Sequence, residues 1–188
     1  MSKPTNIHPL LADRWSPLAF SSKPIPPDVL SSLMTAAQWA PSCFNEQPWR
    51  YIYATIDDAA AHAQLLSCLV PGNQTWAAAA PFLAISVART TFTANGKPNA
   101  YAWHDVGQAT MSILVEAMHH GIQGHQMGGI LPDRVRELYG IPADFTPVAG
   151  LALGYYGERA QLPEAMQARE AGPRPRRAVD ETFFLNRF

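Results

Sequence analysis

The sequence predicts a single α+β domain over residues 1–188, in which helices flank a mixed central β-sheet. This length suffices for one domain with a substantial core. The strand-like runs do not alternate regularly with helices of 10–15 residues, as they would in a doubly wound fold. No Gly-x-Gly-x-x-Gly follows the first strand, and no Gly-x-x-x-x-Gly-Lys-Ser/Thr occurs. Both absences argue against Rossmann and P-loop folds.

Helix and strand signals define the first half of the chain. The predicted elements are a helix over 26–40, a strand over 50–56, a helix over 57–69 and a strand over 82–88. Pro27 and Asp28 suit the first turn of a helix, because proline lacks an N–H there and a carboxylate faces the positive end of the dipole. Pro41 ends this helix, and Pro71-Gly72 is the expected stop of the next one.

The second half contains the longest helix. The predicted elements are a loop over 89–100, a helix over 103–120, a glycine-rich loop over 121–129, a helix over 132–139, a strand over 148–156 and a tail from residue 171. Asn95-Gly96 marks a turn within the first loop. The long helix is apolar on nearly all faces, which is typical of a central helix or of one in a subunit interface.

The composition predicts an oligomer. Hydrophobic residues make up 47% of the chain and charged residues only 15%, against about 25% charged residues in an average soluble protein. A monomer with so little charge would leave much apolar surface in water, so we expect part of that surface to be buried between subunits.

Charge, cysteine content and hydropathy exclude several classes of protein. A net charge of −1 without a basic block argues against nucleic-acid binding. Two cysteines, Cys43 and Cys68, imply no disulfide framework. Residues 1–14 lack a basic start followed by an apolar core, and the longest apolar run, residues 76–88, is too short to span a bilayer. We therefore expect a cytoplasmic protein that does not act at membranes.

Residues 40–50 read Ala-Pro-Ser-Cys-Phe-Asn-Glu-Gln-Pro-Trp-Arg. Two prolines stiffen this segment, and Ser42, Asn45 and Gln47 offer neutral hydrogen-bonding groups that suit an uncharged ring edge such as a flavin's pyrimidine. The segment resembles the Ala-Pro-Ser-x-x-Asn-x-Gln-Pro-Trp signature of the nitroreductase family. The alternative is a simple turn that joins a helix to a strand. The resemblance extends over nearly the whole chain and implies an FMN-binding fold in an intertwined homodimer.

The resemblance also implies the site residues. They are Arg14, Trp15, Ser16, Pro41, Ser42, Cys43, Asn45, Asn73, Met127, Gly128, Gly129, Arg176 and Arg177. Arg14 and Ser16 would bind the FMN phosphate, which suits a guanidinium and a hydroxyl. Arg176 or Arg177 would complete the phosphate site. The family's counterpart of residues 41–45 reaches the flavin of the partner subunit.

Each functional interpretation has a structural alternative. Cys43 lacks a nearby base in its loop, so we interpret it as a packing residue rather than a nucleophile. Gly128 and Gly129 would let backbone N–H groups approach the flavin, whereas Gly121 fits the end of a helix. The tail over 171–188 carries phenylalanines that would embrace the partner, and a disordered basic tail is the alternative.

Two positions depart from the family pattern. Leu18 and Trp76 stand where many members carry a basic residue near the flavin edge that becomes negative on reduction. We interpret Trp76 as a core residue. With both cations absent, we expect a reduction potential below the family's usual range, unless Arg50 or another cation takes their place.

The histidines do not indicate a metal site. His119 and His120 are adjacent and cannot share a helix face, and no cysteine or carboxylate set accompanies them or His125. Asp105 follows His104 at the start of the long helix, where the helix dipole explains a carboxylate. We assign no metal ligand and no catalytic acid or base.

The resemblance implies an FMN-dependent oxidoreductase. Electrons would pass from NAD(P)H through the flavin to an electron-poor small molecule, such as a nitroaromatic or a quinone. Residues 89–100 would shape or cover the substrate pocket. One alternative is an FMN-binding protein with little nicotinamide-driven turnover. Another is an interaction protein that has lost FMN, which the retained Arg14, Ser16, Asn45 and tail arginines argue against.

Overall fold

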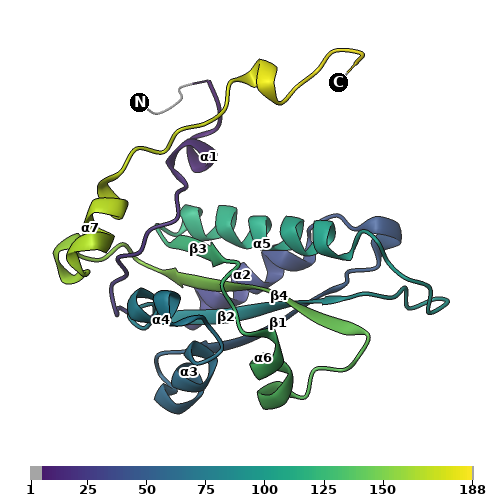
Figure 1. Ribbon diagram of the computed structural model, residues 1–188, viewed down its shortest axis with the longest axis horizontal. Coiled ribbons are helices and arrows are strands. Elements are labelled where there is room, and N and C mark those ends of the chain that lie inside the picture. Colours follow the sequence, from purple (N-terminus) through teal and green to yellow (C-terminus); the bar gives the residue numbers. More distant parts are fainter. Residues whose placement is uncertain (1–5, 188) are drawn as a thin grey trace.

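The computed structural model describes residues 6–187 and has an antiparallel sheet at its centre (Figure 1). The sheet has the order β1-β2-β4-β3, formed by β1 (Trp49–Thr55), β2 (Phe82–Arg89), β3 (Gln123–Met127) and β4 (Phe145–Gly154). All three neighbouring pairs run antiparallel. The predicted α+β class is confirmed, but the strands described here form an antiparallel sheet rather than a mixed one.

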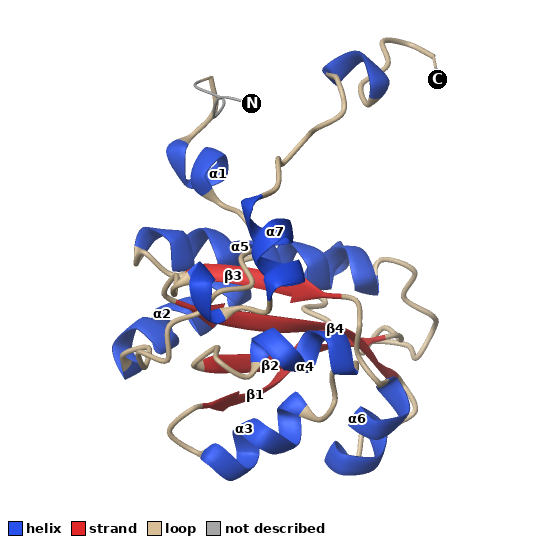
Figure 2. Cartoon of the chain, turned by 60° about the vertical axis from the view of Figure 1, so that its left-hand side comes forward, coloured by secondary structure: helices blue, strands red, loops and turns tan. Residues whose placement is uncertain are grey.

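Helices cover both faces of the sheet and create two cores. The helices α2 (Pro27–Gln38) and α5 (Ala102–His119) pack on one face, and α3 (Ala59–Leu66), α4 (Pro71–Ala77) and α6 (Pro132–Tyr139) on the other (Figure 2). The central strand β2 serves both. Its Phe82 and Ala84 join the α2/α5 core and its Leu83 and Ile85 join the other, because successive side chains of a strand point to opposite faces.

Two predicted connections are in fact regular elements. Pro71 begins helix α4 instead of ending the helix before it, since proline's missing N–H costs nothing in a first helical turn. The glycine-rich loop contains strand β3. Only Gly121 in it has a left-handed φ, of 70°. Gly124 lies within the strand, where an added Cβ would come within 2.2 Å of Leu114 Cδ2, so this glycine permits close helix–sheet packing.

Both ends of the described chain project from the sheet and its helices (Figures 1 and 2). The N-terminal part carries α1 (Pro9–Asp13), and α7 (Glu164–Ala171), which the sequence did not predict, precedes the tail. The described part of the chain also contains three short 3-10 helices: η1 (Cys43–Asn45), η2 (Arg159–Gln161) and η3 (Val179–Glu181). Phe188 lies outside the described residues. Within residues 6–187 no helix is both long and apolar enough to cross a membrane.

Candidate functional site

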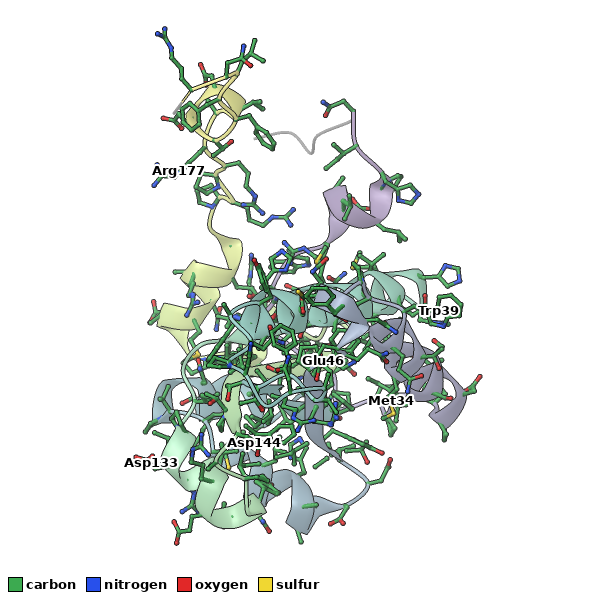
Figure 3. All side chains as sticks on the ribbon, turned by 90° about the vertical axis from the view of Figure 1, so that its right-hand side faces the viewer. Met34, Trp39, Glu46, Asp133, Asp144 and Arg177 are labelled. Carbon is green, nitrogen blue, oxygen red and sulfur yellow. The ribbon has the colours of Figure 1, made fainter. Side chains whose placement is uncertain are left out.

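A cavity of about 240 Å³ lies between the N-terminal segment and the start of the tail. Its lining comprises Arg14, Trp15, Ser16, Leu18, Arg169, Glu170, Gly172, Pro173, Arg174 and Arg176. The structure thus brings four predicted cofactor-binding residues, Arg14, Trp15, Ser16 and Arg176, together from opposite ends of the chain. Arg177 does not line the cavity, and Figure 3 shows it on the tail, away from the core helices.

Positive charge is concentrated around this cavity. Burial lowers the pKa of Arg14, and the guanidinium groups of Arg176 and Arg174 lower it further by repulsion. Arg174 Nη1 donates to the carbonyl of Arg14 at 3.4 Å, and its guanidinium lies 5.6 Å from the ring centroid of Trp15. Arg14 Nη1 lies 3.5 Å from Ser16 Oγ. Guanidinium groups held this close to one another, with a hydroxyl beside them, suit a dianionic phosphate.

Glu170 connects the two chain segments that form this cavity. It is buried, and its two carboxylate oxygens accept hydrogen bonds from the backbone N–H groups of Leu18 at 2.8 Å and Ala19 at 3.2 Å. The carboxylate is therefore occupied by the protein backbone. Glu170 was not predicted as a site residue, because nothing in the sequence connects residue 170 with residues 18 and 19.

A second group of predicted residues lies together beside α4. Asn73 Nδ2 donates to the carbonyl of Gly129 at 3.1 Å, and Met127 is buried at the end of β3. A Cβ on Gly129 would come within 2.7 Å of Asn73 Nδ2, whereas one on Gly128 would meet nothing within 4 Å. The structure therefore explains Gly129 by packing and leaves Gly128 open to a ligand.

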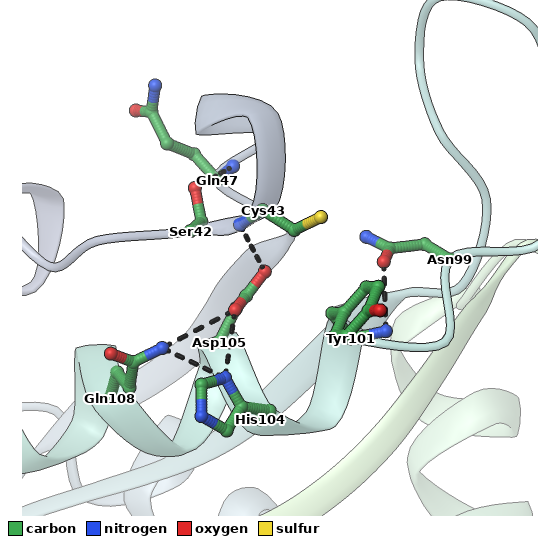
Figure 4. A network of polar contacts seen from close by, with 8 residues as sticks. All are labelled: Ser42, Cys43, Gln47, Asn99, Tyr101, His104, Asp105 and Gln108. Atoms are coloured by element: carbon green, nitrogen blue, oxygen red, sulfur yellow. Dashed lines mark hydrogen bonds and ion pairs between the residues drawn. The ribbon is translucent and has the colours of Figure 1, made fainter.

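The loop after α2 has an unusual backbone. Phe44, Asn45 and Gln47 all have left-handed φ values, of 52°, 56° and 49°, which residues other than glycine rarely adopt. Ser42 Oγ accepts from the backbone N–H of Gln47 at 3.0 Å, and the N–H of Cys43 donates to Asp105 Oδ2 at 3.0 Å (Figure 4). The loop is thus joined to the first turn of α5.

The two groups of predicted flavin contacts lie on different sides of the sheet. The loop over 42–47 is attached to α5, which packs in one core. Met127 packs in the other core, together with Leu18 and Trp76. One chain therefore does not bring the loop together with Asn73, Met127 and the arginine-lined cavity, which we call the cation cavity.

The two positions without a basic residue are part of this second core. Leu18 and Trp76 are each 2% exposed. The ring of Trp76 stacks on that of Phe20, and its centroid lies 4.5 Å from the centroid of the His125 ring. Trp76 is therefore the core residue that we expected. His125 Nδ1 lies 2.8 Å from the carbonyl oxygen of Pro17, and burial lowers the pKa of this imidazole.

The loop over 89–100 contacts the loop over 42–47. Glu46 accepts hydrogen bonds from the backbone N–H of Thr93, at 2.7 Å, and from its hydroxyl. The rings of Phe44 and Phe92 meet edge to face at 6.1 Å. The hydrogen bond from the Thr93 side chain is the main cause that lowers the pKa of Glu46. These contacts join the two loops.

A profile of the nitroreductase family matches residues 11–155. The chain belongs to the nitroreductase family. This confirms the resemblance read from the loop signature, and with it the expected enzyme class, an oxidoreductase.

Individual relatives agree with this assignment. A crystal structure described as an oxidoreductase containing FMN is 36% identical, with a TM-score of 0.92, and the match covers 100% of this chain and 95% of that one. An NADH dehydrogenase of Thermus thermophilus is 30% identical over 174 residues, covering 74% of this chain and 81% of the relative. An uncharacterized 15.4 kDa protein of Mycolicibacterium smegmatis is 34% identical over 88 residues, and this chain spans 59% of its length.

Proposed function

We propose that this nitroreductase-family protein is an FMN-dependent oxidoreductase. The observation that carries the proposal is the cavity of about 240 Å³ where Arg14, Arg174 and Arg176 crowd together beside Ser16. Three like charges in one place are unfavourable for folding unless an anion compensates them. The FMN phosphate supplies such an anion, and the 36% identical oxidoreductase that contains FMN supports this choice.

The chain's own residues bind and orient the cofactor. Bound FMN would supply the redox chemistry, accepting a hydride from NAD(P)H and passing electrons to a nitroaromatic or a quinone. Arg14, Ser16 and Arg176 would hold the phosphate. Asn73 and the open backbone at Gly128 would contact the ring system, to which the loop over 42–47 would contribute neutral hydrogen-bonding groups. We propose the cytoplasm as the location, because the nicotinamide donor is present there.

We further propose that the working form is a homodimer with a flavin site at each interface. The two groups of contacts lie on opposite sides of the sheet of one chain, so a second chain can supply the missing loop. Exposed apolar side chains support this: Phe44 is 90% exposed, and Phe183 and Leu185 on the tail are 77% and 87% exposed. Apolar side chains that lie close together on a surface, as Phe183 and Leu185 do on the tail, are typical of an interface.

The visible absorption spectrum of the purified protein tests the proposal. Flavin bands that bleach when NADH or NADPH is added without oxygen would support the oxidoreductase and identify the donor. Absence of these bands even after incubation with FMN would refute it. A matched measurement with riboflavin, which lacks the phosphate, separates binding at the cation cavity from binding of the ring.

The second candidate is an FMN-binding protein that nicotinamides reduce only slowly. Leu18 and Trp76 favour it, because both are apolar and buried where the family often has a cation. We expect a reduction potential below the family's usual range, since no lysine or arginine at these positions stabilises the anionic reduced flavin. Potentiometric titration checks this expectation. An ordinary potential that the Arg50→Gln variant does not alter would contradict it.

A further inference from the structure

The loop over 42–47 is held in a conformation that its sequence does not favour. Phe44, Asn45 and Gln47 all have left-handed φ values although none is a glycine, and a side chain makes this region unfavourable. Asparagine adopts this conformation more readily than most residues, whereas phenylalanine and glutamine have no local interaction that favours it. Contacts elsewhere must therefore hold the loop in place.

The bonds within the loop cannot fix its position on the protein. The N–H groups of Asn45 and Glu46 donate to the carbonyls of Ser42 and Cys43 at 3.0 and 3.1 Å, and Gln47 N donates to Ser42 Oγ at 3.0 Å. These bonds shape the loop and move with it. The bond from Cys43 N to Asp105 Oδ2, at 3.0 Å, instead joins the loop's backbone to helix α5 (Figure 4).

The burial of the Asp105 carboxylate is energetically unfavourable. Its side chain is 2% exposed, and a buried carboxylate is unfavourable unless hydrogen bonds compensate it. Its Oδ1 lies 3.2 Å from His104 Nδ1 and 3.4 Å from Gln108 Nε2, both on the same helix. Its Oδ2 is directed at the loop. The helix dipole explains an acidic residue in this turn, but not its burial against Cys43.

We propose that Asp105 is a positioning residue for the flavin. It acts through the backbone N–H of Cys43 to hold the loop in the strained conformation that presents Ser42, Cys43 and Asn45 to the ring. This inference rests on the proposed function, because it assumes that the loop contacts FMN. It assigns a role to a buried carboxylate that would otherwise be only a helix-terminal charge.

Two variants of Asp105 separate positioning from simple stability. In Asp105→Asn, the amide oxygen can still accept from Cys43 N, so FMN affinity should stay within about threefold of the wild-type value. Asp105→Leu has similar volume and no acceptor. It should weaken FMN binding by about tenfold or more, the effect of losing a hydrogen bond to a charged group. Riboflavin binding should weaken by the same factor, because the loop contacts the ring and not the phosphate.

Thr110→Val is the matched control. Thr110 is a buried polar residue of the same helix, but its hydroxyl is bonded to Tyr51 OH at 2.8 Å and not to the loop. This variant should lose thermal stability without losing flavin affinity. If Asp105→Leu does not fold, Asp105→Ser replaces it, because its shorter side chain leaves Cys43 N without its acceptor.

Hydrogen exchange of the FMN-free protein gives an independent readout. Exchange over residues 43–47 should accelerate in Asp105→Leu and stay unchanged in Asp105→Asn and Thr110→Val. Unchanged exchange in a folded Asp105→Leu variant, or equal affinity losses in Asp105→Leu and Thr110→Val, would overturn the inference. If the wild type binds neither FMN nor riboflavin, the proposed function fails, and the exchange data still decide whether Asp105 holds the loop.

Discussion

The arginine-lined cavity and the loop over 42–47 are two separate regions of the chain that the proposed homodimer would unite in one flavin site, and they are built on different physical principles. The cavity uses long charged side chains from the N-terminal segment and the tail, with Glu170 joining them through backbone bonds. The loop uses an unfavourable backbone conformation, whose Cys43 N–H donates to Asp105. The cavity can therefore recognise charge, whereas the loop can recognise shape and hydrogen-bonding pattern. Variants that affect one region and spare the other test this division.

The largest effect is expected at the cation cavity. The double variant Arg14→Gln/Arg176→Gln should weaken FMN binding by about 100- to 10,000-fold, because each charge-assisted bond contributes ~1.5–3 kcal/mol. Riboflavin binding should be unchanged, since it lacks the phosphate. Fluorescence titration of both ligands measures the two affinities.

Arg177→Gln is the matched control for this variant, because Arg177 is on the same tail but does not line the cavity. Its FMN affinity should equal that of the wild type. A loss as large as that of Arg176→Gln alone would assign the phosphate to a different arrangement of the tail. Equal losses for FMN and riboflavin would contradict the division between the two regions.

The next effect concerns the partner chain. Phe183→Ser/Leu185→Ser should weaken the proposed homodimer by about 100-fold or more, because burying each of these side chains stabilises an interface by ~1.5–3 kcal/mol. Sedimentation velocity measures the dissociation. If the partner chain supplies the loop, the variant's FMN affinity should fall as well, because loss of the dimer removes the loop from the site. Asp180→Ser, on the same exposed part of the tail, serves as control and should remain dimeric.

The sequence predicts the charged residues of the cavity better than it predicts the contacts that hold the two regions in place. Arginines and a loop signature are visible as residue types, so four of the ten lining residues of the cavity were predicted, among them Arg14 and Arg176. The contacts of Glu170 and Asp105 were not, because each reaches backbone N–H groups that are distant in sequence. In the fold, helix and turn signals located α2, α5 and α6. Strand β3 was missed because its glycine serves tertiary packing, which no local pattern reveals.

Neighbouring glycines offer a smaller, sharper test. Gly129→Ala should destabilise the FMN-free protein by ~1–3 kcal/mol, because the new Cβ would lie 2.7 Å from Asn73 Nδ2 and 2.8 Å from Val70 Cγ2. Gly128→Ala meets nothing within 4 Å and should leave that stability unchanged while weakening flavin binding. Thermal denaturation and flavin titration separate the two effects. Unaltered flavin affinity in Gly128→Ala would remove Gly128 from the site.

The smallest effect is a pH dependence of the contact between the loop over 42–47 and the loop over 89–100. Hydrogen bonds from Thr93 hold the pKa of Glu46 below its usual value. Its folded-state pKa thus lies below that of the unfolded chain. The stabilisation is therefore complete above the unfolded-state pKa and is lost as the pH falls through the folded-state pKa. Because Glu46 is still partly accessible to solvent, the contribution is less than ~1 kcal/mol.

The backbone amide of Thr93 reports this titration, since it donates to Glu46 at 2.7 Å. Its NMR resonance should shift with a midpoint below the usual glutamate range, and the shift should vanish in Glu46→Gln. The loop at Asp105 should not respond, because the amide of Cys43 is bonded to a different carboxylate. A Cys43 amide that titrates together with Thr93 would show that the two anchors of this loop are coupled, and that the loop responds as a single unit to loss of either one.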